Sequence, residues 1–293
     1  MSVLRRLGLG AAAVALCAVL SPGLPAMAEP ALWKVEGPHA TVYLFGTVHV
    51  LKPNTHWRTA KIDTAFNGSN VLYEEIKDAD DAATAQPLVI KYGLDVAHPL
   101  SSKLDATAKA KLVADASLMG VPAAQFEPMR PWLAGLTLTV LPVVKAGYDP
   151  QSGVDITLKA LAGDQHKPLE AFETMEQQIS MFADLPQPLE VEYLLSTLDD
   201  VDKGAGEIND LVDAWAAGDT GKLDDLVNGD LKVHYPELYR IVLKERNQAF
   251  ADRIATLLKG NGVVFVAVGV GHLVGPDSVQ ADLAKVGYTA VRQ

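Results

Sequence analysis

The sequence predicts an α/β fold in which duplicated strand–turn–helix–strand units from the two ends of the chain form a central sheet, with a large helical insertion between them. Near each end, an apolar strand runs into a turn with the spacing Gly-x-x-His-x-x-x-Pro, at residues 46–53 and 269–276. Between about residues 100 and 259, apolar residues instead recur at helical spacing. Because strand–helix–strand units generate parallel sheets, we expect strands from both ends to lie in one sheet.

Residues 1–28 have the pattern of a secretory signal peptide. Arg5 and Arg6 precede an uncharged apolar run, and Ala26-Met27-Ala28 offers small residues for cleavage. The run is shorter than the roughly 20 apolar residues that a membrane span needs, so we expect cleavage rather than stable membrane insertion. The mature chain, residues 29–293, is therefore expected to be a single domain in the periplasm or outside the cell.

The expected mature chain is acidic and lacks cysteine. Without Arg5 and Arg6, 23 of the 25 basic side chains remain against 36 acidic ones, a formal charge of −13. This charge argues against a nucleic-acid partner. Cys17 falls within the expected signal peptide, so neither a disulfide framework nor a thiol nucleophile is expected. An apolar share of 49% indicates a folded core rather than a disordered chain.

The elements are expected in the following order. Two short strands within residues 31–48, joined at Gly37-Pro38, precede a helix over about 57–66 and a strand at 71–73. The helices expected in the middle of the chain are 103–119, 131–146, 152–162, 174–183, 189–200, 206–217 and 237–259. The run at 263–268 is typical of a strand buried on both faces, and a helix over 277–285 and a strand at 288–291 follow it.

The two matching turns place a histidine just beyond the end of a strand. Gly46 and Gly269, the last strand residues, are candidate ligand-binding positions because glycine permits a sharp turn or a close approach to a ligand. His49 and His272 then follow at the carboxyl ends of the strands, where open α/β sheets bind their ligands. Neutral imidazoles that are brought together commonly bind a transition metal, whereas the alternative role is packing or capping.

A hydrolytic metal site also requires a carboxylate, as a ligand or as the base that activates water. Glu75 leaves the strand that follows the first histidine unit, at the same edge of the predicted sheet. Glu74 is the alternative, but adjacent strand residues point to opposite faces, so we assign the role to Glu75. The sequence thus predicts a site for Mn, Co, Zn or Fe formed by His49, His272 and Glu75.

These residues together resemble the TraB/GumN family, which includes the Tiki metalloproteases and pheromone-shutdown proteins. The family is distantly similar to erythromycin esterases and to haem-binding ChaN-like proteins. The segments that carry the resemblance are Gly46-Thr47-Val48-His49, Glu75, Gly153-Val154-Asp155, Phe172-Glu173-Thr174 with Gln178, Arg246-Asn247, and residues 268–276. The resemblance implies a metal-dependent hydrolytic site that contains His49, His272 and Glu75, and it adds Arg246 as a polar partner.

Two functions are consistent with this sequence. The first is an exported metal-dependent hydrolase, specifically a metallopeptidase, that acts on a peptide or protein substrate. The second is a non-catalytic periplasmic protein that sequesters a peptide or a haem-like ligand. The large helical insertion motivates the second function, because it offers walls for a groove. The aromatic residues considered for its lining, for which core packing is the alternative, are Trp132, Phe172, Trp215 and Tyr239.

Overall fold

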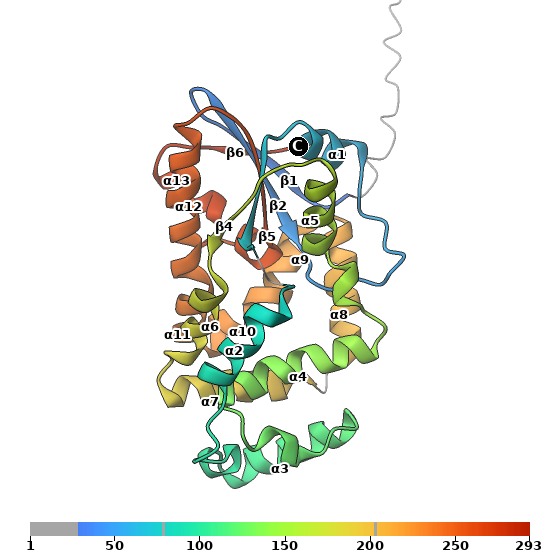
Figure 1. The fold of residues 1–293 in the computed structure, drawn as a ribbon, viewed down its shortest axis with the longest axis vertical. Helices are drawn as coiled ribbons and strands as arrows, with labels where there is room; N and C mark the ends of the chain where they lie inside the picture. The colour runs from blue at the N-terminus through green and yellow to red at the C-terminus, as the bar shows by residue number, and fades with distance from the viewer. Residues whose placement is uncertain (1–28, 78–79, 202–203) are drawn as a thin grey trace, which may run out of the picture.

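The computed structural model describes residues 29–77, 80–201 and 204–293, which form a mixed α/β fold around one sheet (Figure 1). The expected signal peptide, residues 1–28, lies outside the described residues. The strand order in the sheet is β4-β3-β5-β2-β1-β6. The strands are β1 (Leu32–Glu36), β2 (Ala40–Thr47), β3 (Val71–Ile76), β4 (Leu169–Glu173), β5 (Gly262–Gly269) and β6 (Ala290–Arg292).

Strands from the two ends of the chain lie side by side at the centre of this sheet. β2 and β5 pair in parallel along their whole length, from Ala40 opposite Gly262 to Thr47 opposite Gly269. β3 also pairs with β5 in parallel, so the carboxyl ends of β2, β5 and β3 lie at one edge of the sheet. The prediction of one sheet with strands from both ends is therefore confirmed.

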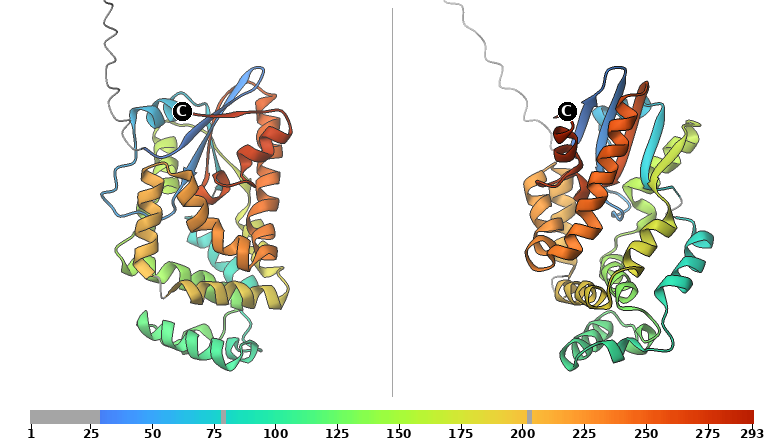
Figure 2. Two further views of the ribbon diagram at one scale, coloured as in Figure 1. Left: turned by 180° about the vertical axis from the view of Figure 1, so that it is seen from behind. Right: turned by 90° about the vertical axis from the view of Figure 1, so that its left-hand side faces the viewer.

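Helices cover both faces of the sheet. On one face, α12 (Glu245–Leu258) and α13 (Val279–Lys285) pack with alternate apolar residues of β5, including Val264 and Val266, in one core cluster. On the other face, α1 (Ala60–Asn67) and α5 (Val154–Asp164) pack around Phe265 in a second cluster. Figure 2 shows the sheet between these helices from two further directions. The apolar run of β5 is thus buried on both faces, as expected for a central parallel strand.

The middle of the chain forms a large helical region next to the carboxyl ends of the central strands, with an apolar core of its own. Its α-helices are α2 (Ala82–Gly93), α3 (Ala106–Leu118), α4 (Pro131–Lys145), α6 (Met175–Ala183), α7 (Gln187–Val201), α8 (Gly204–Ala216), α9 (Thr220–Asp224), α10 (Asp230–His234) and α11 (Pro236–Tyr239). Two π-helical turns, η4 (Asp225–Gly229) and η5 (Arg240–Lys244), and several 3-10 turns complete it. Of the helices that the structure describes, none combines the length and the apolar character needed to cross a membrane.

Three details differ from the expectation. The middle region is not wholly helical, because β4 lies within it and extends the sheet beside β3. The helix α2 was not expected, because Pro87 lies inside it and most of its residues are at least partly exposed, which weakens the apolar pattern. The helix expected at 237–259 contains the π turn η5, whose wider winding changes the rotational position of the residues that follow.

Trp132, Trp215 and Tyr239 are buried side chains of the core. Phe172 stacks on Phe250 of α12 with ring centroids 4.7 Å apart. Trp132, Trp215 and Tyr239 therefore pack within the core, whereas Phe172 packs against α12 and also lines a groove beside β4. Trp215 has an additional role, because its indole Nε1 donates a hydrogen bond of 2.8 Å to the Gly46 carbonyl and so links α8 to the end of β2.

The substitution Trp215→Phe tests this link. It removes the hydrogen bond and leaves the buried Gly46 carbonyl without its donor, so we expect a loss of about 1–3 kcal/mol in the free energy of unfolding. The measurement is urea denaturation followed by circular dichroism. Trp33→Phe, at a half-buried position on β1, is the control with a smaller expected loss. Equal losses in both variants would show that the hydrogen bond to Gly46 contributes nothing specific.

Candidate functional site

The site lies where the turns after β2 and β5 meet the end of β3. A methyl group built on Gly269 would lie 3.0 Å from Oε1 of Glu75, 3.3 Å from Nε2 of His49 and 3.8 Å from Cδ2 of His272. The structure therefore brings the three residues predicted to bind metal together over Gly269. A side chain at position 269 would fill the space between them, which explains why this strand ends in glycine.

The first histidine is held by the start of α5. Nδ1 of His49 lies 2.8 Å from Oδ2 of Asp155, and the Val154 amide donates to the Val48 carbonyl at 3.0 Å. A Cβ atom on Gly153 would lie 2.3 Å from the His49 carbonyl oxygen, so only glycine allows α5 to approach this closely. Because a carboxylate accepts hydrogen bonds, Nδ1 carries the proton and Nε2 faces the site.

The surroundings of His49 favour positive charge. His49 lines a cavity, and 67% of its side-chain surface is accessible. Desolvation lowers the pKa of His49, but the carboxylates of Asp155 and Glu75 outweigh it and raise the pKa to about 9. The position therefore attracts a cation, whether a proton or a metal ion.

The second histidine is held by α12. Nδ1 of His272 contacts Oδ1 of Asn247, whose Nδ2 donates to the Asp277 carbonyl at 2.7 Å. Because the Asn247 oxygen can only accept, Nδ1 of His272 is the donor, and Nε2 faces Glu75 and Arg246. That Nε2 lies 3.5 Å from Oε1 of Glu75. His272 is buried, and its ring also packs against Phe250 at 5.1 Å.

Glu75 joins the two histidine turns. Its Oε1 accepts the Gly269 amide at 2.7 Å, and its Oε2 accepts from Arg246 at 2.6 Å and from Gln178 at 3.3 Å. Burial raises the pKa of this carboxyl, but His272 and Arg246 more than offset it and hold the pKa well below its usual range. Glu75 is therefore ionised.

Arg246 is the buried cation of the site. Its guanidinium forms a two-point pair with Glu173, from Nε to Oε1 at 2.8 Å and from Nη2 to Oε2 at 2.7 Å. Its Nη1 lies 3.3 Å from Nε2 of His272, and the group lies over the Phe250 ring. Arg246 lies two residues after the end of the π turn η5, and π turns are frequent at functional sites. The helix pattern alone predicted a surface position for it, whereas its side chain is only 13% exposed.

Glu74 lies on the opposite face of β3 from Glu75. It is 5% exposed, and its Oε1 has no hydrogen-bond partner among the residues that the structure describes. Burial and the nearby Asp155 raise the pKa of Glu74 to about 8, against the opposing effect of Lys159. The pKa values of the two adjacent carboxyls are therefore shifted in opposite directions, and of the two only Glu75 contacts His272 and Arg246.

A cavity of about 380 Å³ opens beside these residues. Its lining includes His49 and both glutamates of β3, whereas His272 lies behind Glu75 and outside the lining. The residues that line it are His49, Glu74, Glu75, Ile76, Lys77, Asp80, Pro150, Gln151, Asp155, Ile156, Lys159 and Gln178. A small substrate group in this cavity is therefore within reach of His49 and Glu75.

The donor chemistry of the site fits a divalent metal ion. Each histidine has its Nδ1 tied to an oxygen acceptor and its Nε2 directed to the site, the arrangement usual for metal-binding histidines. The spacing of Nε2 of His272 and Oε1 of Glu75 suits two ligands of one ion bound at about 2.0–2.2 Å. Within the described part of the chain, however, no group of three or more His, Cys, Asp or Glu side chains is arranged to hold a metal.

The structure also adds residues to the predicted set. Asp155, Asn247, Glu173 and Gln178 hold the two histidines, Arg246 and Glu75 in place. All four residues lie in the segments that carry the family resemblance, which is the sequence feature that pointed to them. For Glu173 and Gln178, however, a position at the start of a helix was an equally good explanation. Gly46, in contrast, packs against Val270, because a Cβ atom there would lie 3.0 Å from Cγ2 of Val270.

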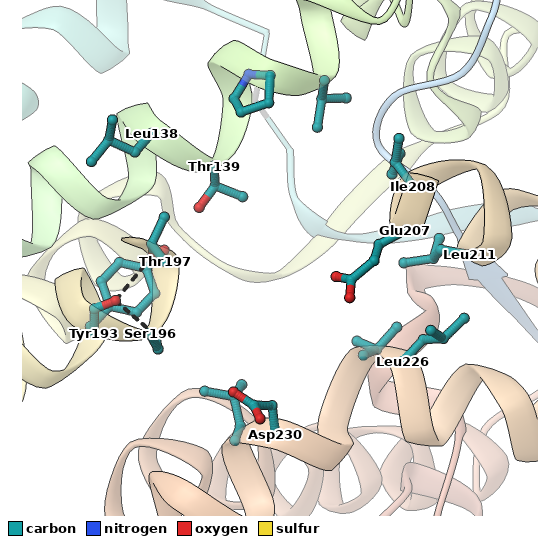
Figure 3. Close-up of a pocket in the computed structure, with 14 residues that line it drawn as sticks. Leu138, Thr139, Tyr193, Ser196, Thr197, Glu207, Ile208, Leu211, Leu226 and Asp230 are labelled. Carbon is teal, nitrogen blue, oxygen red and sulfur yellow. Dashed lines mark hydrogen bonds between the residues drawn. The ribbon is translucent and has the colours of Figure 1, made fainter. Parts of the chain in front are cut away.

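A second cavity, of about 340 Å³, lies in the helical region between α4, α7, α8 and α10 (Figure 3). Its lining contains none of the predicted site residues. Figure 3 shows the Glu207 and Asp230 side chains extending toward a space surrounded by apolar groups such as Leu138 and Leu211. On one side, Ser196 and Thr197 donate hydrogen bonds to the Tyr193 carbonyl.

The model of the TraB/PrgY/gumN family matches residues 31–292. An uncharacterized protein of Treponema pallidum (strain Nichols) is 22% identical over 278 residues, which cover 88% of this chain and 81% of that protein. The uncharacterized protein YbaP of Escherichia coli (strain K12) is 27% identical over 157 residues, or 54% of this chain and 57% of YbaP. No solved structure gives a significant match.

The substitution Arg246→Met tests the electrostatic role of the guanidinium. It leaves the carboxylates of Glu75 and Glu173 buried without their cation, so we expect a loss of about 3–5 kcal/mol in the free energy of unfolding. Urea denaturation at neutral pH measures it. The control is Arg240→Met, because Arg240 pairs with the exposed Glu237, and a surface pair contributes about 0–1 kcal/mol. A loss in Arg246→Met no larger than in the control contradicts this account.

Proposed function

The chain belongs to the TraB/PrgY/gumN family, and we propose that it is an exported metal-dependent hydrolase that cuts peptides, with His49, His272 and Glu75 as the metal-binding residues. One observation carries the proposal: two histidines from opposite ends of the chain turn their Nε2 atoms toward the same carboxylate, over Gly269. Each histidine is fixed from behind by an oxygen acceptor. Packing alone does not require such an arrangement.

His49, His272 and Glu75 would hold the divalent metal, which would supply polarisation of a carbonyl group and a lower pKa of a bound water. Hydrolysis of a peptide bond adds the hydroxyl of water to the carbonyl carbon and its proton to the departing nitrogen. Glu75 supplies the carboxylate, either as a ligand or as the acceptor of the water proton at Oε1. Arg246 keeps Glu75 ionised and holds its Oε2 in place.

The proposed peptide substrate and the proposed export are each supported by a different feature. The resemblance to the Tiki metalloproteases supports a peptide or protein substrate, and the polar cavity beside His49 offers space for a substrate group. The signal pattern of residues 1–28 supports export to the periplasm or beyond.

Metal content provides the direct test. We expect the purified mature chain to bind Mn, Co, Zn or Fe, and the double variant His49→Ala/His272→Ala to bind at least tenfold less while remaining folded. Elemental analysis after dialysis measures the metal, and circular dichroism checks the fold. His98→Ala/His234→Ala is the matched control, because both side chains are exposed and pair with acidic neighbours. Unchanged metal content in the folded His49/His272 variant would falsify the metal site.

Asp155 provides a finer test of the same site. Asp155→Asn removes the negative charge behind His49 but preserves its size, and the loss of such a partner costs about 10–100-fold in metal affinity. Competition with a fluorescent chelator measures the affinity. Asp149→Asn is the control, because Asp149 caps the 3-10 turn Pro150–Ser152 that precedes α5. If the two variants bind metal equally well, the Asp155 carboxylate does not tune a metal ligand.

The cavity of the helical region favours a second candidate function, the binding of a ligand without turnover. A peptide library incubated with manganese or cobalt separates the two candidates, because saturable binding without cleavage under either metal favours the binder. Leu211→Trp narrows this cavity. We expect it to abolish binding by such a binder and to leave a hydrolase fully active.

A further inference from the structure

The outer edge of β4 is a free edge of the sheet. β4 is the terminal strand beside β3 and runs parallel to it, with Glu74 opposite Ala171. The Leu72 amide donates to the Pro168 carbonyl, so the main-chain groups of Glu170 and Phe172 also face β3. The main-chain groups of Leu169, Ala171 and Glu173 therefore face outward. Among the described residues, none forms a main-chain hydrogen bond with the Ala171 amide or carbonyl on this side.

A groove of about 620 Å³ runs along this edge. Its apolar lining includes Pro87 and Leu88 of α2, Ala171 and Phe172 of β4, and Met175 of α6. Five residues of β4 extend over about 16 Å, at roughly 3.3 Å per residue. The groove thus combines unpaired main-chain donors and acceptors with apolar side chains.

The groove leads to the candidate site. Ile76 and Lys77, at the end of β3, line both this groove and the cavity that contains His49 and Glu75. Glu173, the last residue of β4, belongs to the groove and also pairs with Arg246. A chain that lies along β4 is therefore directed toward the site.

We propose that an extended peptide binds along the outer edge of β4 as an added strand and delivers a neighbouring segment to the cavity beside His49. A regular row of alternating N–H and C=O groups is complementary to a peptide main chain, and addition of a strand to a sheet edge is an established way to bind peptides. Recognition then depends on the main chain and tolerates many sequences. The claim that the bound peptide is a substrate rests on the proposed hydrolase function. The claim that the peptide binds along β4 does not depend on that function.

The first experiment asks whether main-chain hydrogen bonds carry the binding. The probe is a fluorescein-labelled peptide, Lys-Thr-Val-Thr-Val-Thr-Lys, added to the mature chain with a metal chelator, and fluorescence polarisation measures binding. N-methylation of alternate residues leaves one edge of the peptide able to pair, so binding is retained. N-methylation of every residue blocks both edges, and we expect at least a tenfold weaker affinity. Equal binding of all three peptides, or no saturable binding, overturns the proposal.

The second experiment uses the protein side of the contact. Ala171→Pro removes an outward amide without removing a hydrogen bond to β3, and proline is tolerated on such an edge. We expect at least tenfold weaker binding than in Ala171→Ser, which keeps the amide. If Ala171→Pro unfolds, Leu88→Trp fills the groove from α2 and is expected to show the same loss. Val113→Trp, at an exposed position of α3 that lines neither cavity nor groove, is the control that binds normally.

The outcomes separate this proposal from the proposed function. If peptides bind along β4 but are cut with none of the metals, the proposed hydrolase function is refuted and the proposed peptide-binding groove still stands. If folded Ala171→Pro cleaves peptides as efficiently as the wild type, the proposed peptide-binding groove is refuted and the proposed hydrolase function still stands. A second copy of the chain is the other possible occupant of the β4 edge, and sedimentation of the chain without peptide tests for it. Concentration-dependent dimers that Ala171→Pro abolishes would assign the edge to a second copy and overturn the proposal.

Discussion

The arrangement of the site depends on one buried guanidinium. Arg246 bridges the carboxylates of Glu75 and Glu173, which end the neighbouring strands β3 and β4. Because burying charges without partners is costly, this single contact fixes α12 against two strands at once. The same cation keeps Glu75 ionised, and the Gly269 amide holds the other oxygen of that carboxylate. The position of His272 then follows from α12, through Asn247.

The sequence allowed the central part of this arrangement to be predicted. The two turns have the same residue spacing. This repeated spacing can be recognised wherever the ends of the individual strands and helices are placed. The roles of Asp155 and Asn247 were not predicted, because each contacts a histidine that is remote in sequence and leaves no periodic pattern. β4 was missed because a five-residue edge strand with two glutamates resembles the start of the helix that follows it. Local propensity fails where a distant partner, here β3, decides the structure.

The two histidines differ in burial and in surroundings, although their turns share one spacing. His272 is enclosed by α12, by Phe250 and by the 3-10 turn η6 (Val270–Leu273). His49 is open to the cavity and is held mainly by the start of α5. The site therefore has a buried side formed by the turn after β5 and a more accessible side formed by the turn after β2. The cavity, and the groove along β4 that adjoins it, lie on the accessible side.

The pairing of β2 with β5 has a consequence for biosynthesis. Thr47 and Gly269 become neighbours only after the chain has been made as far as β5. Contacts between segments so far apart in sequence give a high contact order, which slows folding. A nascent chain emerging from the ribosome therefore has no assembled centre until β5 and the turn after it have been made. If the centre is hydrolytic, this topology delays its activity until that point of synthesis.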